Sequence, residues 1–407
     1  MSTATGQQPR LGLAYRRLLT ASVISTAGDG VRFAALPLLA ASLLPEPFQI
    51  AVVTAATTLP WLLFGLPAGA FADRWNRTRL MVLADVLRAA ALLGAVTLLT
   101  ANKLALEPLV GLALLLGVGE VLFDCASFAV LPGVVPDSRL ETANGQLFAA
   151  QTVSRDLLGH LLGGVLYSLG RAIPLLVDAI SFAMSALLLR TMPTPPPFRR
   201  DRRSLLTEIG DGLSCILGDR LLILLTVAAG LINGVYLGQV AILVVFVQRV
   251  LGMSPTGYAA LLATGALGGA LGGAVAGKVM RLAGQSVILL GSIGLIGACG
   301  LGIMAGTVWT TVIGYFLMGF GIMTWNVVSV SLRQTVVPDR LLGRTIGVYR
   351  LCAWGTMPIG ALVFGAVADG MGSAVAFGAG GLSILVFGVI IAPSVLRDTR
   401  LSMRMQR

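Results

Sequence analysis

Charged residues are scarce in this sequence. Only 12% of its 407 residues are Asp, Glu, Lys or Arg, whereas 56% are hydrophobic. The mean hydropathy of +0.89 exceeds what the core of a soluble protein requires. The shortage of charge therefore excludes a soluble globular protein and predicts a chain that lies in a lipid bilayer.

Cysteine and histidine are also rare, and their scarcity argues against several kinds of site. The four cysteines lie far apart in the sequence, so neither a disulfide framework nor a zinc site is indicated. There is one histidine, and the sequence contains no HExxH, GxSxG or nucleotide-binding loop motif. We therefore expect no enzyme activity, no cofactor, no bound metal and no hydrolysis of ATP by this chain.

Long apolar segments account for most of the sequence. Twelve of them reach about 20 residues, the length that an α-helix needs to cross the hydrocarbon core of a membrane. They are apolar on all sides and do not alternate with period two, which favours helices over a β-barrel. The predicted fold class is therefore an all-α integral membrane protein. The approximate limits are 17–43, 48–72, 79–101, 108–132, 143–168, 172–191, 218–248, 256–278, 285–305, 308–332, 343–370 and 374–394.

Basic residues are distributed unevenly around these segments. If both termini are cytoplasmic, 22 of the 29 Lys and Arg residues lie on the cytoplasmic side, four lie within the segments, and only Lys103, Arg171 and Arg249 lie on the other side. This asymmetry follows the positive-inside rule and predicts a bacterial inner-membrane protein with both termini in the cytoplasm. Because the net charge of +11 is spread over loops and tails, it favours contact with anionic lipids over nucleic-acid binding.

A polar stretch divides the chain near its middle. Residues 192–203, MPTPPPFRRDRR, are rich in proline and arginine and cannot be helical throughout. Residues 204–217, SLLTEIGDGLSCIL, form a short amphipathic pattern that suits a helix on the membrane surface. We therefore expect a six-helix bundle over 1–191, a cytoplasmic linker with a short helix over 192–217, and a second six-helix bundle with a basic tail over 218–407.

The two bundles are related in sequence. VVPDSRLETANG at Val134 matches VVPDRLLGRTIG at Val336 with an offset of 202 residues. Asp29-Gly30-Val31 matches Asn233-Gly234-Val235 with an offset of 204 residues. Such matches in order indicate an internal duplication. Parallel six-helix repeats are typical of secondary transporters that alternate the access to a central site.

One loop carries a family resemblance. GAFADRWNRTR, residues 69–79, resembles the signature loop between helices 2 and 3 of the major facilitator superfamily, with Asn76 where glycine is usual. We expect Asn76 to tolerate the left-handed conformation that such a glycine supplies. AGDGVRFAALPLL, ADRWNRTRLMVLADVLRA, LPGVVPDSRLETANG and VDAISFAMSALLLR resemble more narrowly the branch that contains enterobactin exporters, macrolide efflux pumps and Tap-type multidrug pumps. The resemblance extends over nearly the whole chain and implies a fold of two pseudo-symmetric six-helix bundles.

The signature loop also implies a gate. An aspartate at the end of helix 2 can accept hydrogen bonds from the N-terminal amides of a neighbouring helix. The resemblance implies that this neighbour is helix 11, which begins near Gly343 and Arg344. We expect Asp73, assisted by Arg74 and Arg77, to stabilise the outward-open state. The alternative is that these charges only set the topology.

Small residues recur at intervals of four in helices 2, 5, 8 and 11. Such faces let helices approach closely and slide, so we expect them at the seam between the two bundles; the alternative is tight packing within one bundle. The residues are Gly65 and Gly69, Gly159 and Gly163, Gly265, Gly269, Gly273 and Gly277, and Ala361 and Gly365.

Acidic residues lie within the predicted spans. Asp29 is about 12 residues into the first span, or ~18 Å deep, where an ionised carboxylate must be paired, hydrated or protonated. Arg32, at i+3, can pair with it. Glu120 and Asp124, at i and i+4, share one helix face, where their mutual repulsion favours uptake of a proton by one of them. We expect these three acidic residues to couple proton movement to transport.

Other charged residues occur in the same spans. Asp156 is a further candidate for proton coupling, with Arg155 as its ready partner, and the role of the nearby His160 stays open between a proton carrier and an interior histidine. Asp85, Arg88 and Asp178 are expected nearer the membrane interfaces, with structural roles. The alternative for every acidic residue is a neutralising ion pair that fixes helix packing.

The substrate cavity is expected to be rich in aromatic and thioether side chains, which accommodate varied amphipathic molecules. Asn233 and Tyr236 are the neutral counterparts of Asp29 and Arg32 in the second bundle. The other expected lining residues are Phe33, Trp61, Phe148, Met318, Met323, Trp325, Tyr349, Arg350 and Trp354. The alternative for these residues is packing or an interfacial belt.

Together these features predict a monomeric, proton-coupled exporter of amphipathic small molecules such as antibiotics or secondary metabolites. Its expected partners are a small-molecule substrate, protons and the lipid bilayer. A siderophore exporter and a flippase for lysophospholipids or other lipids remain as alternatives.

Overall fold

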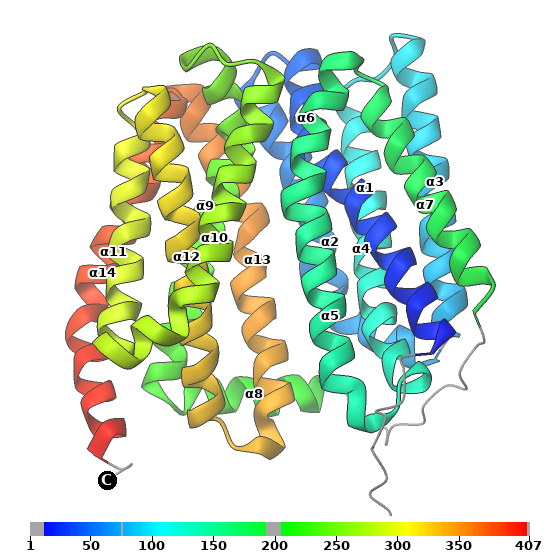
Figure 1. Cartoon of the computed structure of the whole chain (residues 1–407). Helices are drawn as coiled ribbons and strands as arrows, with labels where there is room; N and C mark the ends of the chain where they lie inside the picture. Colours follow the sequence, from blue (N-terminus) through cyan, green and yellow to red (C-terminus); the bar gives the residue numbers. More distant parts are fainter. Residues whose placement is uncertain (1–11, 75, 193–204, 405–407) are drawn as a thin grey trace, which may run out of the picture.

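The chain folds into helices joined by short loops (Figure 1). The computed structural model describes residues 12–74, 76–192 and 205–404, and these residues contain no strand. The α-helices are α1 (Leu13–Leu43), α2 (Pro47–Arg74), α3 (Arg77–Thr100), α4 (Leu106–Val134), α5 (Leu140–Thr152), α6 (His160–Leu169), α7 (Ile173–Arg190), α8 (Leu205–Leu217), α9 (Arg220–Val245), α10 (Pro255–Ala283), α11 (Gln285–Ile303), α12 (Val308–Val336), α13 (Asp339–Met371) and α14 (Ser373–Arg404). A 3₁₀ turn, η1 (Asp137–Arg139), and two π-helical segments, η2 (Val153–Gly159) and η3 (Phe246–Val250), complete the assigned elements.

The predicted all-helical membrane fold is confirmed. Eleven helices in the described part of the chain are long and apolar enough to cross a membrane. The span expected over 143–168 is divided among α5, η2 and α6, of 13, 7 and 10 residues, which follow one another without a break. The predicted number of twelve spans is therefore reached only if these three elements are taken as one.

Capping side chains explain where several helices begin. The Oδ1 of Asn76 accepts a hydrogen bond from the backbone N–H of Arg79 over 3.1 Å and starts α3. Asn76 has φ −66° and ψ 110°, so the expected left-handed conformation at this position is wrong. The residue acts instead as an N-cap, which is the position that asparagine favours. Asp219 caps α9 in the same way through the N–H of Leu222, at 3.0 Å.

The linker helix α8 packs on α13. It lies at the end of the molecule where α1 begins and α14 ends (Figure 1). Asp211 Oδ2 accepts a hydrogen bond from Arg344 Nη1 over 2.5 Å, so the residue expected beside the gate is held by α8. The side chains of Asp73 and Arg74 lie outside the described residues. Arg77 donates to the carbonyl oxygen of Ala129 on α4 over 2.6 Å.

The helices before α8 form the N-terminal half of the protein, and those after α8 form the C-terminal half. Two hydrogen bonds join the halves at the end opposite α8. The N–H of Phe48, in the first turn of α2, donates to Asp369 Oδ1 near the end of α13, at 3.2 Å. Arg249 Nη2 donates to the carbonyl oxygen of Pro45 over 2.8 Å. The halves are therefore tied together at this end.

Glycines permit close packing both between the halves and within them. Gly365 on α13 lies against Ala51 on α2, so the predicted role at the seam is right for helix 11. Gly159 packs on α1, and Gly265 packs on Tyr315 of α12, each within its own half. For these two positions the expected place at the seam is wrong, because the stripe faces a neighbour in the same half. At the seam, helix 5 instead places Gly164 against the start of α10.

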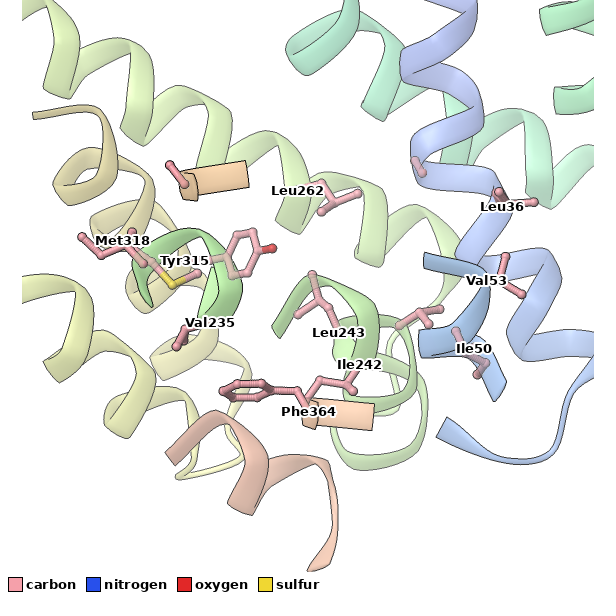
Figure 2. Packing of buried hydrophobic residues seen from close by; sticks show 14 of the residues in the cluster. Leu36, Ile50, Val53, Val235, Ile242, Leu243, Leu262, Tyr315, Met318 and Phe364 are labelled. Carbon is pink, nitrogen blue, oxygen red and sulfur yellow. The ribbon is translucent and has the colours of Figure 1, made fainter. Parts of the chain in front are cut away.

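Buried apolar side chains form a cluster that extends from one half into the other (Figure 2). Leu36 on α1 and Val53 on α2 belong to it, as do Leu243 on α9 and Phe364 on α13. This apolar core surrounds the charged residues of the N-terminal half and raises the cost of leaving any of them unpaired.

One glycine should be intolerant of even a methyl group. A Cβ atom at Gly30 would lie 2.2 Å from the carbonyl oxygen of Arg155, which is backbone and cannot turn away. We expect Gly30→Ala to lower the free energy of unfolding by about 1–3 kcal/mol through overpacking. The matched control is Gly111→Ala on α4, where a Cβ atom meets nothing within 4 Å. Thermal denaturation in detergent measures both, and equal stability of the two variants would contradict the expectation.

Candidate functional site

Eight charged side chains meet inside the N-terminal half. They come from α1, α3, α4, η2 and α7, and ion pairs of at most 4 Å join them into one network, which we call the charge cluster. Its members are Asp29, Arg32, Asp85, Arg88, Glu120, Asp124, Arg155 and Asp178. Five carboxyl groups thus face three guanidinium groups, which leaves two carboxyl groups without a compensating positive charge in the cluster.

Asp29 lies at the centre of the charge cluster. Its Oδ1 accepts from Arg32 Nη2 over 2.7 Å, as the i,i+3 spacing predicts. Its Oδ2 lies 3.5 Å from Arg88 Nη1 and 3.9 Å from Arg155 Nη2. Asp29 is only 4% exposed, so three arginines stabilise its negative charge inside the apolar core.

The arginines distribute their charge over several acids. Arg32 also lies 3.2 Å from Asp178 Oδ2 through its Nε and 3.5 Å from Glu120 Oε2 through its Nη2. Arg88 pairs with Asp85 as well as with Asp29. This arrangement holds α1, α3, α4 and α7 together, because each guanidinium bonds to acids from more than one helix.

Arg88 is held by aromatic rings as well as by acids. Its guanidinium carbon lies 4.0 Å from the ring centroid of Phe182 and 5.0 Å from that of Phe123. Cation–π contacts of this kind gain strength where water is excluded, and Arg88 is fully buried. The rings therefore fix the side chain that in turn orients Asp29.

The expected position of Asp85, Arg88 and Asp178 near the membrane interfaces is wrong. All three side chains are fully buried, and Arg88 and Asp178 contact the Asp29–Arg32 pair directly. One signal in the sequence could have revealed part of this arrangement. The pattern Asp-x-x-Arg of α1 recurs in α3 at Asp85 and Arg88 with the same spacing.

The charge cluster is accessible from one side only. The side chains of Glu120 and Asp124 on α4 are 19% and 18% exposed, and that of Arg155 is 29% exposed. Arg155 Nη1 lies 3.4 Å from Glu120 Oε1, and its Nη2 lies 3.9 Å from Asp124 Oδ2. These three groups can exchange partners with molecules outside the cluster, whereas the deeper acids cannot.

The π-helical segment η2 explains how two neighbouring charges separate. A π-turn inserts an extra residue into the helical ladder and shifts the faces of the side chains that follow, and such turns are frequent at functional sites. Arg155 enters the charge cluster, but Asp156 has no Lys or Arg within ion-pair distance among the described residues other than those of its own backbone neighbourhood. Asp156 instead lies within electrostatic range of Tyr236 on α9. The predicted pairing of Asp156 with Arg155 is therefore wrong.

His160 lies one turn beyond Asp156 and joins the interior of the half. Its ring stacks on Phe33 of α1, with centroids 4.9 Å apart and an angle of 26° between the planes. Its Nδ1 is buried and has no hydrogen-bond partner in the described part of the chain. The position that carries proline in the family motif thus holds an aromatic packing contact.

Several expected cavity residues meet where the halves approach each other. Trp61 on α2 and Trp354 on α13 form an edge-to-face pair with centroids 5.1 Å apart. The guanidinium of Arg350 lies 5.6 Å from the Trp354 ring centroid. Tyr236 and Phe33 pack together against a small apolar cluster shared by α2, α9 and α13. Asn233 is half-buried on α9.

The structure removes other residues from the expected cavity. Trp325 is only 2% exposed and lies in the core of the C-terminal half, together with Met318 and Tyr349. Phe148 and Met323 are exposed on the surface. Residue type alone could not separate lining residues from core residues, because both are apolar.

No group of three or more His, Cys, Asp or Glu side chains in the described ranges is arranged to hold a metal ion. The chemistry available to the charge cluster is therefore the exchange of protons and of ionic partners at Glu120, Asp124 and Arg155.

The sequence resembles those of known membrane transporters. The family model described as Major Facilitator Superfamily matches residues 18–357. The multidrug efflux pump Tap of Mycolicibacterium fortuitum is 28% identical over 398 residues, which cover 92% of this chain and 93% of that protein. The lysophospholipid transporter LplT of Photorhabdus laumondii is 28% identical over 276 residues, which cover 66% of this chain and 67% of that protein.

The fold is also similar to that of a solved transporter. The nucleoside transporter NupG superposes with a TM-score of 0.78 at 13% sequence identity, covering 94% of this chain and 99% of that chain. At this identity the likeness shows the fold alone. Both comparisons agree with the resemblance that the signature loop predicts.

Proposed function

This chain belongs to the Major Facilitator Superfamily and is a membrane transporter, and we propose that it exports amphipathic small molecules in exchange for protons. The observation that supports this proposal most directly is the excess of carboxyl groups in the charge cluster. Five carboxyl groups against three guanidinium groups leave room for two protons, or for positive charge on a substrate, without burying an uncompensated charge.

Glu120 and Asp124 are the best candidates for the residues that carry protons. Both side chains are partly exposed, so protons can reach them, and both contact Arg155. Asp29 is buried and held by three arginines, which favours a role in anchoring the cluster. A proton on either residue of α4 weakens its hold on Arg155 and thereby loosens η2 from α4.

Alternating access follows from the way the two halves meet. The hydrogen bonds from Phe48 to Asp369 and from Arg249 to Pro45 tie the halves together at the end opposite α8. If the positive-inside rule assigns the α8 end to the cytoplasm, as we propose, this arrangement is open toward the cytoplasm. Substrate would enter from that side, and the halves would then rock about the charge cluster as two bodies. We further propose that one chain suffices for this cycle.

The edge-to-face pair of Trp61 and Trp354 gives the pathway an aromatic surface. Flat amphipathic molecules stack on such rings, and partly exposed acids near them favour a positive charge on the molecule. This combination supports export of antibiotics and secondary metabolites, and the multidrug efflux pump Tap is a relative with the same extent of chain.

A panel of cationic amphipathic dyes and antibiotics tests the proposal in a pump-deficient bacterial host. We expect cells that express the protein to accumulate less ethidium than control cells, and we expect a protonophore to remove the difference. A difference that persists with the protonophore would show that protons do not drive the export. Equal accumulation of every compound in the panel would contradict drug export.

A second candidate function is the transport of lysophospholipids. It is favoured by the similarity to the lysophospholipid transporter LplT over 276 residues. Purified protein in liposomes distinguishes the two, because only a lipid transporter would move a fluorescent lysophospholipid across the bilayer.

A further inference from the structure

Two arginines in the C-terminal half have no acidic partner. Arg333 on α12 is buried, donates from Nε to the carbonyl oxygen of Ser329 over 3.1 Å, and lies 3.4 Å from the ring centroid of Tyr349. Arg350 on α13 is exposed and lies over Trp354. Among the side chains that the structure describes, no carboxylate lies within 4 Å of either guanidinium. A positive surface is thus built on this half, just as a negative excess is built on the other.

These two surfaces face each other across the space between the halves. Cys125 on α4 lies within electrostatic range of both Asp124, its neighbour, and Arg350 on α13. The contact between Trp61 and Trp354 joins the same two sides. Arg333 and Arg350 are in turn within electrostatic range of each other. The positive pair therefore lies opposite the acids of α4, and no direct ion pair closes the gap between Arg350 and Asp124.

From this opposition of charge we infer that the site between the halves binds a zwitterionic amphiphile. Its cationic group would lie at Glu120 and Asp124, its anionic group at Arg350 with Arg333 behind it, and its apolar part on Trp61 and Trp354. The inference rests on the proposed transport through this space and names the class of its substrate.

The charges explain why a zwitterion fits better than a singly charged molecule. A simple cation satisfies the acids of α4 but leaves two guanidinium groups uncompensated, and a simple anion does the opposite. A molecule that carries both charges compensates both surfaces and adds no net charge to the membrane interior. Guanidinium binds carboxylate and phosphate alike through paired N–H donors, so the anionic group can be either.

Four probes with the same dodecyl chain test the inference on the purified full-length protein in a maltoside detergent. They are dodecylphosphocholine and N-dodecyl-N,N-dimethylglycine, which are zwitterions, dodecyltrimethylammonium, a cation, and dodecyl phosphate, an anion. Binding is followed by the change in tryptophan emission. We expect at least one zwitterion to bind about tenfold more tightly than either singly charged probe, the effect of one additional charge-assisted hydrogen bond. The two zwitterions distinguish a site for phosphate from a site for carboxylate.

Variants assign each charge to its surface. We expect Arg350→Gln to weaken the zwitterion to the level of the cation while leaving the cation unchanged, and Glu120→Gln to weaken the zwitterion and the cation together. Arg249→Gln, at the end opposite α8, is the matched control and should change neither. Equal affinity for all four probes, or an Arg350→Gln variant that weakens every probe alike, would overturn the inference. Neither result depends on protons, so a failure of proton coupling in the transport assay would leave this binding order intact.

Discussion

Substrate-driven proton movement is expected to fall to the level of protein-free liposomes when Glu120→Gln and Asp124→Asn are combined. The amides keep the size and hydrogen-bonding capacity of the acids but cannot take up a proton near neutral pH. Both acids are partly exposed and contact Arg155, so their loss removes the accessible titratable groups of the charge cluster and leaves its buried members in place. A pH-sensitive dye inside liposomes measures the movement after substrate is added.

The single variants and one control make this test specific. Glu107→Gln lies on the same helix, is exposed, and belongs to its first turn, outside the charge cluster, so it should behave as the unmodified protein. If one single variant already abolishes proton movement, that residue carries the proton. Normal proton movement in the double variant would exclude both acids and return attention to Asp29 or Asp156.

Replacing Arg88 with methionine is expected to cost about 3–5 kcal/mol in the free energy of unfolding, the range found when one partner of a buried ion pair is removed. The change leaves Asp85 with no ion-pair partner and removes one of three from Asp29, all within the apolar core. It also removes the contacts with Phe123 and Phe182. Thermal denaturation in detergent, followed by the fraction of protein that stays monodisperse, measures the loss.

A second substitution separates the charge effect from the packing effect. Adding Asp85→Asn to Arg88→Met removes the orphaned carboxylate, so the double variant should be more stable than Arg88→Met alone. Arg155→Met serves as the control for loss of an arginine at a wetter site, because its side chain is 29% exposed. An Arg88→Met variant as stable as the unmodified protein would show that the cluster does not support the fold.

Local features of the site could be predicted from the sequence. The pairing of Asp29 with Arg32 follows from a spacing of three residues within one helix, and the helical spans follow from length and apolarity. The contribution of Arg88 and Asp178 could not be predicted with the same certainty. Their distance from Asp29 depends on how α3 and α7 are rotated against α1, and a single sequence carries no direct signal for that rotation.

The same reason explains the errors among aromatic and small residues. Trp325 and Trp354 have the same chemistry, but one faces the core of its half and the other faces the opposite half. Gly159 and Gly365 both belong to stripes of small residues, yet only Gly365 faces the other half. The interruption of the fifth span by η2 was also not foreseen, because no proline or glycine marks the start of the π-turn at Val153.

The two hydrogen bonds at the end opposite α8 set a bias on the resting protein. They join Phe48 to Asp369 and Arg249 to Pro45, and both must break before that end can open. Each such bond contributes about 0.5–1.5 kcal/mol, and ~1.4 kcal/mol changes a population ratio tenfold. The fraction of molecules waiting in either orientation, and with it the turnover rate, can therefore be tuned at the rim by residues that touch neither cargo nor protons.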